Sequence, residues 1–247
     1  MYLTAKYLFD FLISLLGLII LLPIFIPIIL ILRFTGDREI IYFQERIGHK
    51  QKPFIIWKFS SMLKNSINMG SKTVTLRNDP RITPMGKYLR ITKINEILQL
   101  VNVLEGNMSL VGARPLIPNS FKKYSQAVQD KIYNTRPGVT GIGSLVFRDE
   151  EKLVTAVRNM GIEPLDYYAK YIYPYKGALE MWYQENISFS TDLKILLLTF
   201  WQILFPKSEL TFKIMRGLPK RPDELTVNGL LSLGPAGLGL KPVAEKN

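Results

Sequence analysis

Charged side chains that could bind a phosphate group are concentrated in the middle of the chain. Glu96 and three arginines, Arg90, Arg114 and Arg136, fall within fewer than fifty residues. Arg114 and Arg136 stand in the glycine- and proline-containing segments SLVGARP and TRPGVTG, and a loop of that kind can present the planar guanidinium to a phosphate in a bidentate contact. A carboxylate can hold Mg²⁺ beside substrate phosphates. The pattern therefore predicts a site for a diphosphate-containing substrate, although a carboxylate at a helix start, taken alone, is usually a capping residue.

The cysteine, histidine and hydrophobic content of the chain excludes several kinds of catalytic and metal site. The chain has 247 residues, no cysteine and one histidine, His49. These counts exclude disulfide frameworks, thiol nucleophiles and multi-histidine metal sites. Since 47% of the residues are hydrophobic, the composition also excludes intrinsic disorder. Any catalysis must depend on carboxylates, basic side chains, hydroxyls and a hard cation such as Mg²⁺.

An uncharged segment near the N-terminus predicts attachment to a membrane. Residues 11–32 contain eighteen Leu, Ile and Phe, worth about 5 to 10 kcal/mol on an insertion scale. A cleaved signal peptide is disfavoured because the run is long and no small-x-small cleavage site follows it. Only Lys6 precedes the run, whereas five basic residues follow it closely: Arg33, Arg38, Arg46, Lys50 and Lys52. The positive-inside rule then places the remaining domain in the cytoplasm, where the net charge of +12 faces anionic phospholipid headgroups.

Hydropathy alone does not decide whether this segment spans the bilayer, because about 20 apolar residues suffice to cross it. Pro23 and Pro27 lie in the middle of the run and each removes a helical hydrogen bond. A helix that breaks and re-enters the same leaflet and a kinked spanning helix are both compatible with this pattern.

Local patterns predict the elements that position the charged residues. Residues 40–43 and 53–59 read as a hairpin around a turn at 48–52. Thr83 and Pro84 start a short helix through Arg90, Thr92 caps a second helix that reaches Gly106 with Asn95 and Glu96 in its first turn, and residues 190–205 form a third. The Gly-, Pro- and Leu-rich tail, 217–247, is expected to be poorly ordered.

Several motifs in order resemble one known family. They are YFQERIGHKQKPFIIWKFSSM at 42–62, RNDPRITPMGKYLR at 77–90, NEILQLVNVLEGNMSLVGARPL at 95–116, RPGVTG at 136–141 and SFSTDLKILLLT at 188–199. The chain is similar to the bacterial sugar transferases of the small monotopic phosphoglycosyl transferase family. The resemblance implies a compact, helix-rich α/β (α+β) domain with a small sheet, seated on an N-terminal re-entrant helix that breaks at Pro23. The implied division is an anchor at 1–36, a catalytic domain at 37–216 and the tail.

The resemblance also implies a reaction and its participants. Such enzymes transfer a sugar-1-phosphate from a UDP-sugar to polyprenyl phosphate with Mg²⁺, at the cytoplasmic face of the bacterial inner membrane, and so start a lipid-linked glycan. The implied catalytic residues are Glu96, Asn95 and Arg90, with Glu96 also the metal ligand. The implied substrate-binding residues are Arg114, Pro115, Arg136, Pro137, Gly138 and Glu180.

Residue 95 departs from the family pattern at the position of the attacking aspartate. The family's Asp-Glu dyad, whose aspartate attacks the phosphate, reads Asn95-Glu96 here, and a neutral amide is a poor nucleophile. Three hypotheses follow: Glu96 is the nucleophile, the lipid phosphate attacks directly, or the protein is a catalytically impaired partner or regulator of glycan assembly. Lys93, Leu98, Ala113, Ser60, Glu180 and the segment 141–151 also depart from the usual pattern.

A membrane-tethered nucleic-acid binder is the competing class of function. The positive charge alone suggests it, but aromatic-interleaved RNA-binding signatures are missing from the sequence. We therefore expect no nucleic-acid partner. A homodimer is one of the oligomeric states that the sequence leaves open.

Overall fold

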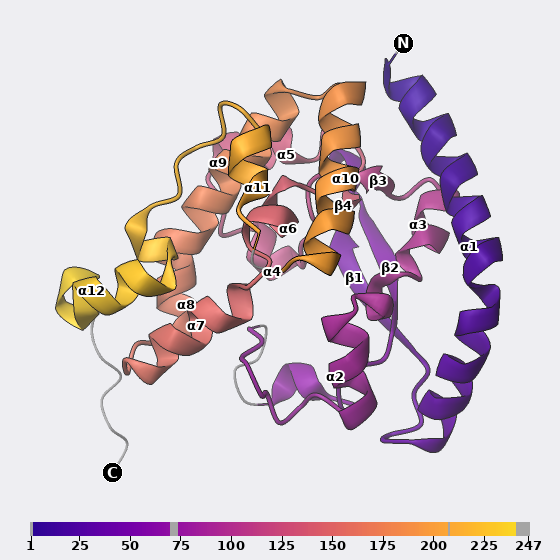
Figure 1. Cartoon of the computed structure of the whole chain (residues 1–247), viewed down its shortest axis with the longest axis horizontal. Helices are drawn as coiled ribbons and strands as arrows, with labels where there is room; N and C mark the ends of the chain where they lie inside the picture. Colours follow the sequence, from indigo (N-terminus) through magenta and orange to yellow (C-terminus); the bar gives the residue numbers. More distant parts are fainter. Residues whose placement is uncertain (1, 70–73, 207, 241–247) are drawn as a thin grey trace.

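The computed structural model describes residues 2–69, 74–206 and 208–240. In this part of the chain, short helices surround two small sheets, and one long helix lies along the side of the domain (Figure 1). The α+β class expected from the sequence is confirmed. The first half contains α1 (Tyr2–Phe34), β1 (Ile41–Ile47), η1 (His49–Gln51), β2 (Pro53–Phe59), η2 (Ser66–Asn68), α2 (Pro84–Ile91), η3 (Ile94–Glu96), α3 (Gln99–Leu104), β3 (Ser109–Val111), α4 (Pro118–Phe121) and α5 (Gln126–Ile132). The second half contains β4 (Gly138–Thr140), α6 (Ile142–Val146), α7 (Glu150–Asn159), α8 (Pro164–Tyr167), η4 (Tyr168–Ile172), α9 (Tyr173–Glu185), α10 (Phe189–Leu204), α11 (Leu210–Ile214), η5 (Asp223–Leu225) and α12 (Val227–Gly237).

Helix α1 is long and apolar enough to cross a membrane. It has 33 residues and remains one helix through Pro23 and Pro27, so the break that the resemblance implied at Pro23 is wrong for this structure (Figure 1). A proline removes only one helical hydrogen bond, and packing of Phe25 and Ile28 against the domain holds the helix in line beyond Pro23. Many of its other large apolar side chains are exposed.

Both ends of α1 are attached to the domain. Near its start, the hydroxyl of Tyr2 donates to Asp192 of α10 at 2.6 Å, and Lys6 forms a buried ion pair with the same carboxylate. Near its end, Leu32 belongs to a buried apolar cluster that includes Phe59 of β2 and Leu89 of α2. The helix therefore lies along the domain over its length instead of projecting from it.

The hairpin and the first short helix confirm the sequence interpretation. Strands β1 and β2 pair antiparallel, with Tyr42 opposite Lys58. Helix α2 starts at Pro84, and the Thr83 side chain accepts a hydrogen bond from the backbone N–H of Gly86 at 3.0 Å. The apolar segment that begins β1 and the cap of α2 are local signals, so the sequence alone carries them.

The predicted helix from Thr92 to Gly106 is wrong at its start. The Thr92 hydroxyl donates to the carbonyl of Tyr88 at 2.8 Å, so this residue ends α2. Lys93 then adopts a left-handed conformation with φ 61°, which reverses the chain direction before η3. Glu96 and Asn95 therefore lie on a single 3-10 turn. The Glu96 carboxylate is thus not stabilised by the N-terminus of a longer helix.

Helix α10 begins one residue earlier than predicted, at Phe189, because the Ser188 side chain caps it by accepting from Thr191 N–H at 3.2 Å. Its Ile195 and Leu198 are buried in the main core, whereas Leu197 and Phe200 are exposed. The helix thus packs on the domain with one face and presents an apolar face outward.

The tail is folded as far as the structure describes it, so the expectation of poor order is wrong for residues 217–240. Leu225, Leu230 and Leu238 are fully buried in the main core, and the Tyr171 hydroxyl donates to the carbonyl of Leu238 at 2.6 Å. The Gly-, Pro- and Leu-rich composition gave the wrong prediction because leucines spaced along a glycine-rich segment can still bury apolar area. Residues 241–247 lie outside the described residues.

Candidate active site

Glu96 lies at the centre of a group of basic side chains. Its Oε1 accepts from Lys58 Nζ at 2.8 Å and from Arg114 Nη2 at 2.7 Å, and its Oε2 accepts from Arg114 Nη1 at 3.3 Å. The side chains of Glu96 and Lys58 are about 15% and 13% exposed, while that of Arg114 is 41% exposed. Arg114 is therefore the member of the group most open to a ligand.

Electrostatics keep Glu96 ionised in this setting. Burial acts to raise the pKa of Glu96, but Arg114, Lys58 and Lys93 together outweigh burial and hold that pKa well below its usual range. Burial lowers the pKa of Lys58 to about 7 against the opposing attraction of Glu96, and Arg114 adds to the lowering. Burial likewise lowers the pKa of Arg46 to about 10, with Arg114 adding to the effect. The Glu96 carboxylate thus lies among several basic side chains, and the negative charge of a bound phosphate or diphosphate would favour their protonated forms.

Two strand-to-loop connections position Arg114. Strand β3 pairs parallel with β4, and the backbone N–H of Gly138 donates to the carbonyl of Ala113 at 2.9 Å. A Cβ at Gly112 would come within 2.5 Å of the Arg136 carbonyl oxygen, and one at Gly138 within 2.1 Å of the Gly112 nitrogen. These two glycines allow the backbones to approach closely, so Pro137 and Gly138, predicted to bind substrate, contact the Arg114 loop through their backbone.

The loop after Arg114 is fixed from its other side. The Tyr133 hydroxyl donates to the Arg114 carbonyl at 2.9 Å and accepts from Leu116 N–H at 2.9 Å. Arg46 Nη1 donates to the Pro115 carbonyl at 3.1 Å. Pro115, another predicted substrate-binding residue, therefore lies in a loop that Arg46 and Tyr133 hold in place.

The other two predicted arginines are engaged elsewhere. Arg90 Nη2 pairs with Glu151 at 2.5 Å, next to the site but on a different carboxylate. The Arg136 guanidinium stacks over the ring of Tyr7 with 4.0 Å between Cζ and the ring centre. The structure brings Glu96 and Arg114 together and gives Arg136 a partner on α1.

Glu180 is buried on α9, behind the Arg114 loop. It is 4% exposed, and its Oε2 has no hydrogen-bond partner in the described part of the chain. A Cβ at Gly143 would come within 2.6 Å of its Oε1, so glycine is needed there for the carboxyl group to fit. Burial raises the pKa of Glu180 to about 8, although Lys176 opposes the effect, and the group is mostly protonated at neutral pH.

Asn95 is 6% exposed, and its Oδ1 is buried with no partner among the described residues. Within residues 2–69, 74–206 and 208–240, no three His, Asp or Glu side chains gather into a group that could hold a metal ion. The site offers a divalent cation the Glu96 carboxylate, and the amide of Asn95 precedes it in the chain. That is enough for Mg²⁺ only when phosphate oxygens complete its coordination.

Sequence reasoning missed Lys58 and Arg46 as site residues. Tyr42 lies directly opposite Lys58 in the hairpin, and Arg46 lies on the same face of β1 as Tyr42 because side chains alternate along a strand. The basic residues at positions 46 and 58 of the predicted hairpin were therefore a usable signal. The pairing of Lys58 with a carboxylate nearly forty residues later was not visible in the sequence.

Comparison with known proteins gives a consistent result. Residues 1–206 match the bacterial sugar transferase family. The "exopolysaccharide production protein ExoY" of Sinorhizobium fredii is 32% identical over 167 residues, which is 62% of this chain and 74% of that protein. The "undecaprenyl-phosphate galactose phosphotransferase" of Salmonella typhimurium is 32% identical over 78% of this chain and 39% of that protein. The "UDP-glucose:undecaprenyl-phosphate glucose-1-phosphate transferase" of Escherichia coli is 35% identical over 53% of this chain and 29% of that protein.

Proposed function

Because the chain belongs to the bacterial sugar transferase family, we propose that it transfers a sugar-1-phosphate from a UDP-sugar to undecaprenyl phosphate and so begins an exopolysaccharide or related glycan. The observation that carries the proposal is the partly exposed Arg114 beside buried Lys58, both on the single carboxylate of Glu96. Such a surplus of positive charge fits the diphosphate of a nucleotide-sugar. The names of the relatives support both the lipid acceptor and the sugar-phosphate product.

The chemistry that suits this site is direct displacement. Asn95 has no nucleophilic oxygen comparable to a carboxylate, and Glu96 is a weak nucleophile while Lys58 and Arg114 neutralise its charge. An oxygen of the lipid phosphate then forms a bond to the phosphorus next to the sugar, and the bridging P–O bond to UMP breaks. Lys58 and Arg114 stabilise the negative charge that develops on the departing UMP.

A divalent cation is the proposed cofactor, with Mg²⁺ the expected ion. The Glu96 carboxylate and the unpartnered Oδ1 of Asn95 would hold it together with substrate phosphate oxygens. When bound, the ion would add positive charge at the diphosphate.

The proposed location is the cytoplasmic face of the bacterial inner membrane. Helix α1 exposes many large apolar side chains, and α10 adds more on its outer face. The basic residues that follow α1 favour the cytoplasmic side.

The test is an assay of detergent-purified protein with a panel of UDP-sugars, undecaprenyl phosphate and Mg²⁺, with UMP release as the readout. Arg114→Ala is expected to weaken UDP-sugar binding by about 1.5 to 3 kcal/mol, the scale for hydrogen bonds to a charged group. Lys122→Ala removes one charge from an exposed position after α4 and should bind as the wild type does. No UMP from any sugar would contradict the proposed function.

A further inference from the structure

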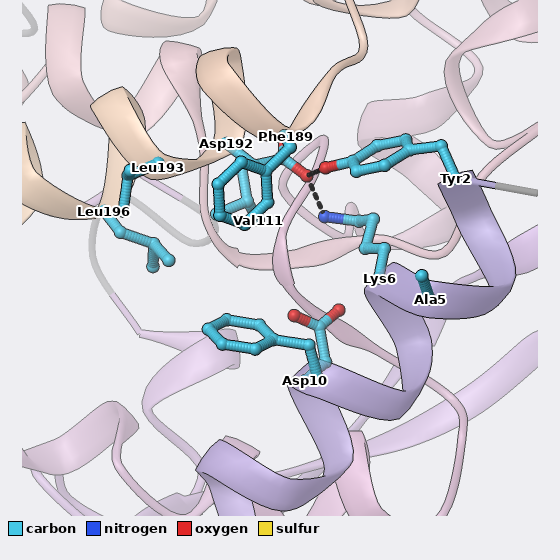
Figure 2. A pocket seen from close by; sticks show the side chains of 10 residues that line it. Tyr2, Ala5, Lys6, Asp10, Val111, Phe189, Asp192, Leu193 and Leu196 are labelled. Carbon is cyan, nitrogen blue, oxygen red and sulfur yellow. Dashed lines mark hydrogen bonds and ion pairs between the residues drawn. The ribbon is translucent and has the colours of Figure 1, made fainter.

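A cavity of about 290 Å³ lies between the start of α1 and the start of α10. Its apolar lining comes from Ala5 and Phe9 of α1, Val111 of β3, and Phe189, Leu193 and Leu196 of α10. Figure 2 shows Leu193 and Leu196 on α10 facing the first turns of α1. The cavity is separate from the Glu96 site, and none of the roles described above uses it.

The two carboxylates of the cavity, Asp10 and Asp192, already have hydrogen-bond partners in the protein. The Asp192 carboxylate accepts from Tyr2 at 2.6 Å and from Lys6 (Figure 2). It also accepts from Tyr183 at 2.8 Å. Asp10 accepts from the Ser109 hydroxyl at 2.5 Å. Since these carboxylates have protein partners, an occupant needs to supply no polar group, and the walls favour a hydrocarbon chain.

The surroundings of the cavity indicate how such a chain would enter. Three lining side chains, Phe9, Phe189 and Leu193, are 44%, 59% and 41% exposed. They continue directly into the exposed apolar residues of the two helices, such as Leu12 on α1 and Leu197 on α10. A chain could pass from a surrounding lipid phase into the cavity without crossing a polar surface.

One residue of the cavity wall, Val111, belongs to the chain segment that carries Arg114. Val111 ends β3 and stands three residues before Arg114, so the two Cα atoms are at most about 11 Å apart. A lipid whose phosphate reaches Arg114 can therefore place its first hydrocarbon units beside Val111.

We propose that this cavity binds the phosphate-proximal isoprenoid units of the acceptor lipid. The inference rests on the proposed function, because that function supplies an acceptor with an isoprenoid chain. A phospholipid acyl chain is the competing occupant. Its binding in the cavity would not depend on a polyprenyl phosphate held at Arg114.

Filling the cavity tests the proposal through kinetics. Leu193→Trp places an indole in the cavity and should raise KM for undecaprenyl phosphate about tenfold, the scale of steric discrimination in an apolar pocket, with KM for the UDP-sugar unchanged. Leu197→Trp makes the same replacement on the exposed face of α10, where the wild-type leucine is 61% exposed, and should leave both constants unchanged. Equal effects of the two variants, or an equal rise in both KM values, would overturn the proposal.

A binding experiment tests which lipid occupies the cavity, even if the protein shows no catalytic turnover. Undecaprenyl phosphate carrying a diazirine in its first isoprene units should label peptides from residues 2–10 and 189–196. Excess unlabelled undecaprenyl phosphate should suppress the labelling, whereas phosphatidylglycerol should not. Labelling elsewhere, or equal suppression by both lipids, would reject the isoprenoid assignment. Absence of UMP release together with specific labelling would instead reject the proposed reaction alone.

Discussion

Asn95 determines which chemistry the site can perform. Its side chain is buried next to Glu96, and its Oδ1 has no partner in the described structure. An amide at this place cannot form the acyl-phosphate that a carboxylate would form. The surrounding cations nevertheless remain, so the electrostatic part of the site does not depend on residue 95.

Substituting Asn95→Asp should therefore add a covalent step. We expect the variant, mixed with UDP-sugar and Mg²⁺ but without lipid, to release up to one UMP per protein, because Lys58 and Arg114 would favour an ionised carboxylate nearby. Rapid-quench measurement of UMP gives the amplitude. Wild type and Asn95→Ala should show no such burst.

Two outcomes would contradict this reasoning. A burst from the wild type would show that another residue, such as Glu96, is the nucleophile. An Asn95→Asp variant less active in full turnover than an active wild type would show that the site has adapted to the amide, so that residue 95 is more than a lost aspartate.

Glu180 should make the stability of the protein depend on pH. Its pKa is raised to about 8 by burial, so the folded state binds one more proton than the unfolded state between about pH 4.5 and 8. This contribution to stability is fully present below about pH 4.5 and is lost as pH rises through about 8. Glu180→Gln should reduce the loss of unfolding free energy between pH 5 and 8 by a few kcal/mol.

Denaturant unfolding of wild type and variant at the two pH values provides the measurement. Lys176 and the Arg114 loop face Glu180, and they remain in both proteins, so their contributions cancel in the comparison. Glu180→Asp keeps a buried acid and should keep the pH dependence. Identical pH profiles for wild type and Glu180→Gln would show that the carboxyl group is ionised in the folded protein.

Elements whose formation depends on neighbouring residues were predictable from the sequence. Elements whose bounds depend on contacts between distant residues were not. The hairpin of two apolar segments around the turn at 48–52 and the Thr83-Pro84 start of α2 depend on adjacent residues, and both are confirmed. Thr92 has the chemistry of an N-cap, but a hydroxyl can also donate to the carbonyl four residues earlier. It does so here, because Lys93 takes a left-handed conformation that the sequence does not announce.

The residues of the candidate site were likewise predictable only in part. Glu96 and Arg114 were predictable as phosphate-site residues from their types and loops, and the structure places them in contact. Pairing of Arg90 with Glu151 and stacking of Arg136 on Tyr7 join residues more than sixty positions apart. Only the packing of α7 and α1 against the domain determines those contacts.

The segment after the family match is an integral part of the core, and α12 provides a test. Leu230 is fully buried, whereas the adjacent Leu231 is 67% exposed. Leu230→Ala should lower the free energy of unfolding by about 2 to 5 kcal/mol, and Leu231→Ala should change it by less than about 0.5 kcal/mol. Equal effects in denaturant unfolding would mean that the segment does not belong to the cooperative core.

For the molecule as a whole, the contacts of α1 restrict its arrangement in a membrane. A helix of 33 residues is about 50 Å long, which exceeds the roughly 30 Å of a bilayer's hydrocarbon core. Length alone would allow it to span. However, Tyr2 and Lys6 bind Asp192 at one end, and Leu32 packs in the Phe59 cluster at the other. A spanning helix could not contact one extramembrane domain at both ends.

We therefore predict that both ends of α1 lie on the cytoplasmic side. The chain contains no cysteine, so Leu3→Cys, Phe34→Cys and Lys122→Cys each introduce a single thiol. Residues 3 and 34 are 38% and 80% exposed, and Lys122 reports the side on which the domain lies. A membrane-impermeant maleimide should label all three variants in inside-out vesicles and none in intact spheroplasts, because the polar ends of the helix stay with the domain. Labelling of Leu3→Cys alone in spheroplasts would mean that α1 crosses the membrane, and the contacts between Tyr2, Lys6 and Asp192 would then have to be absent in the bilayer.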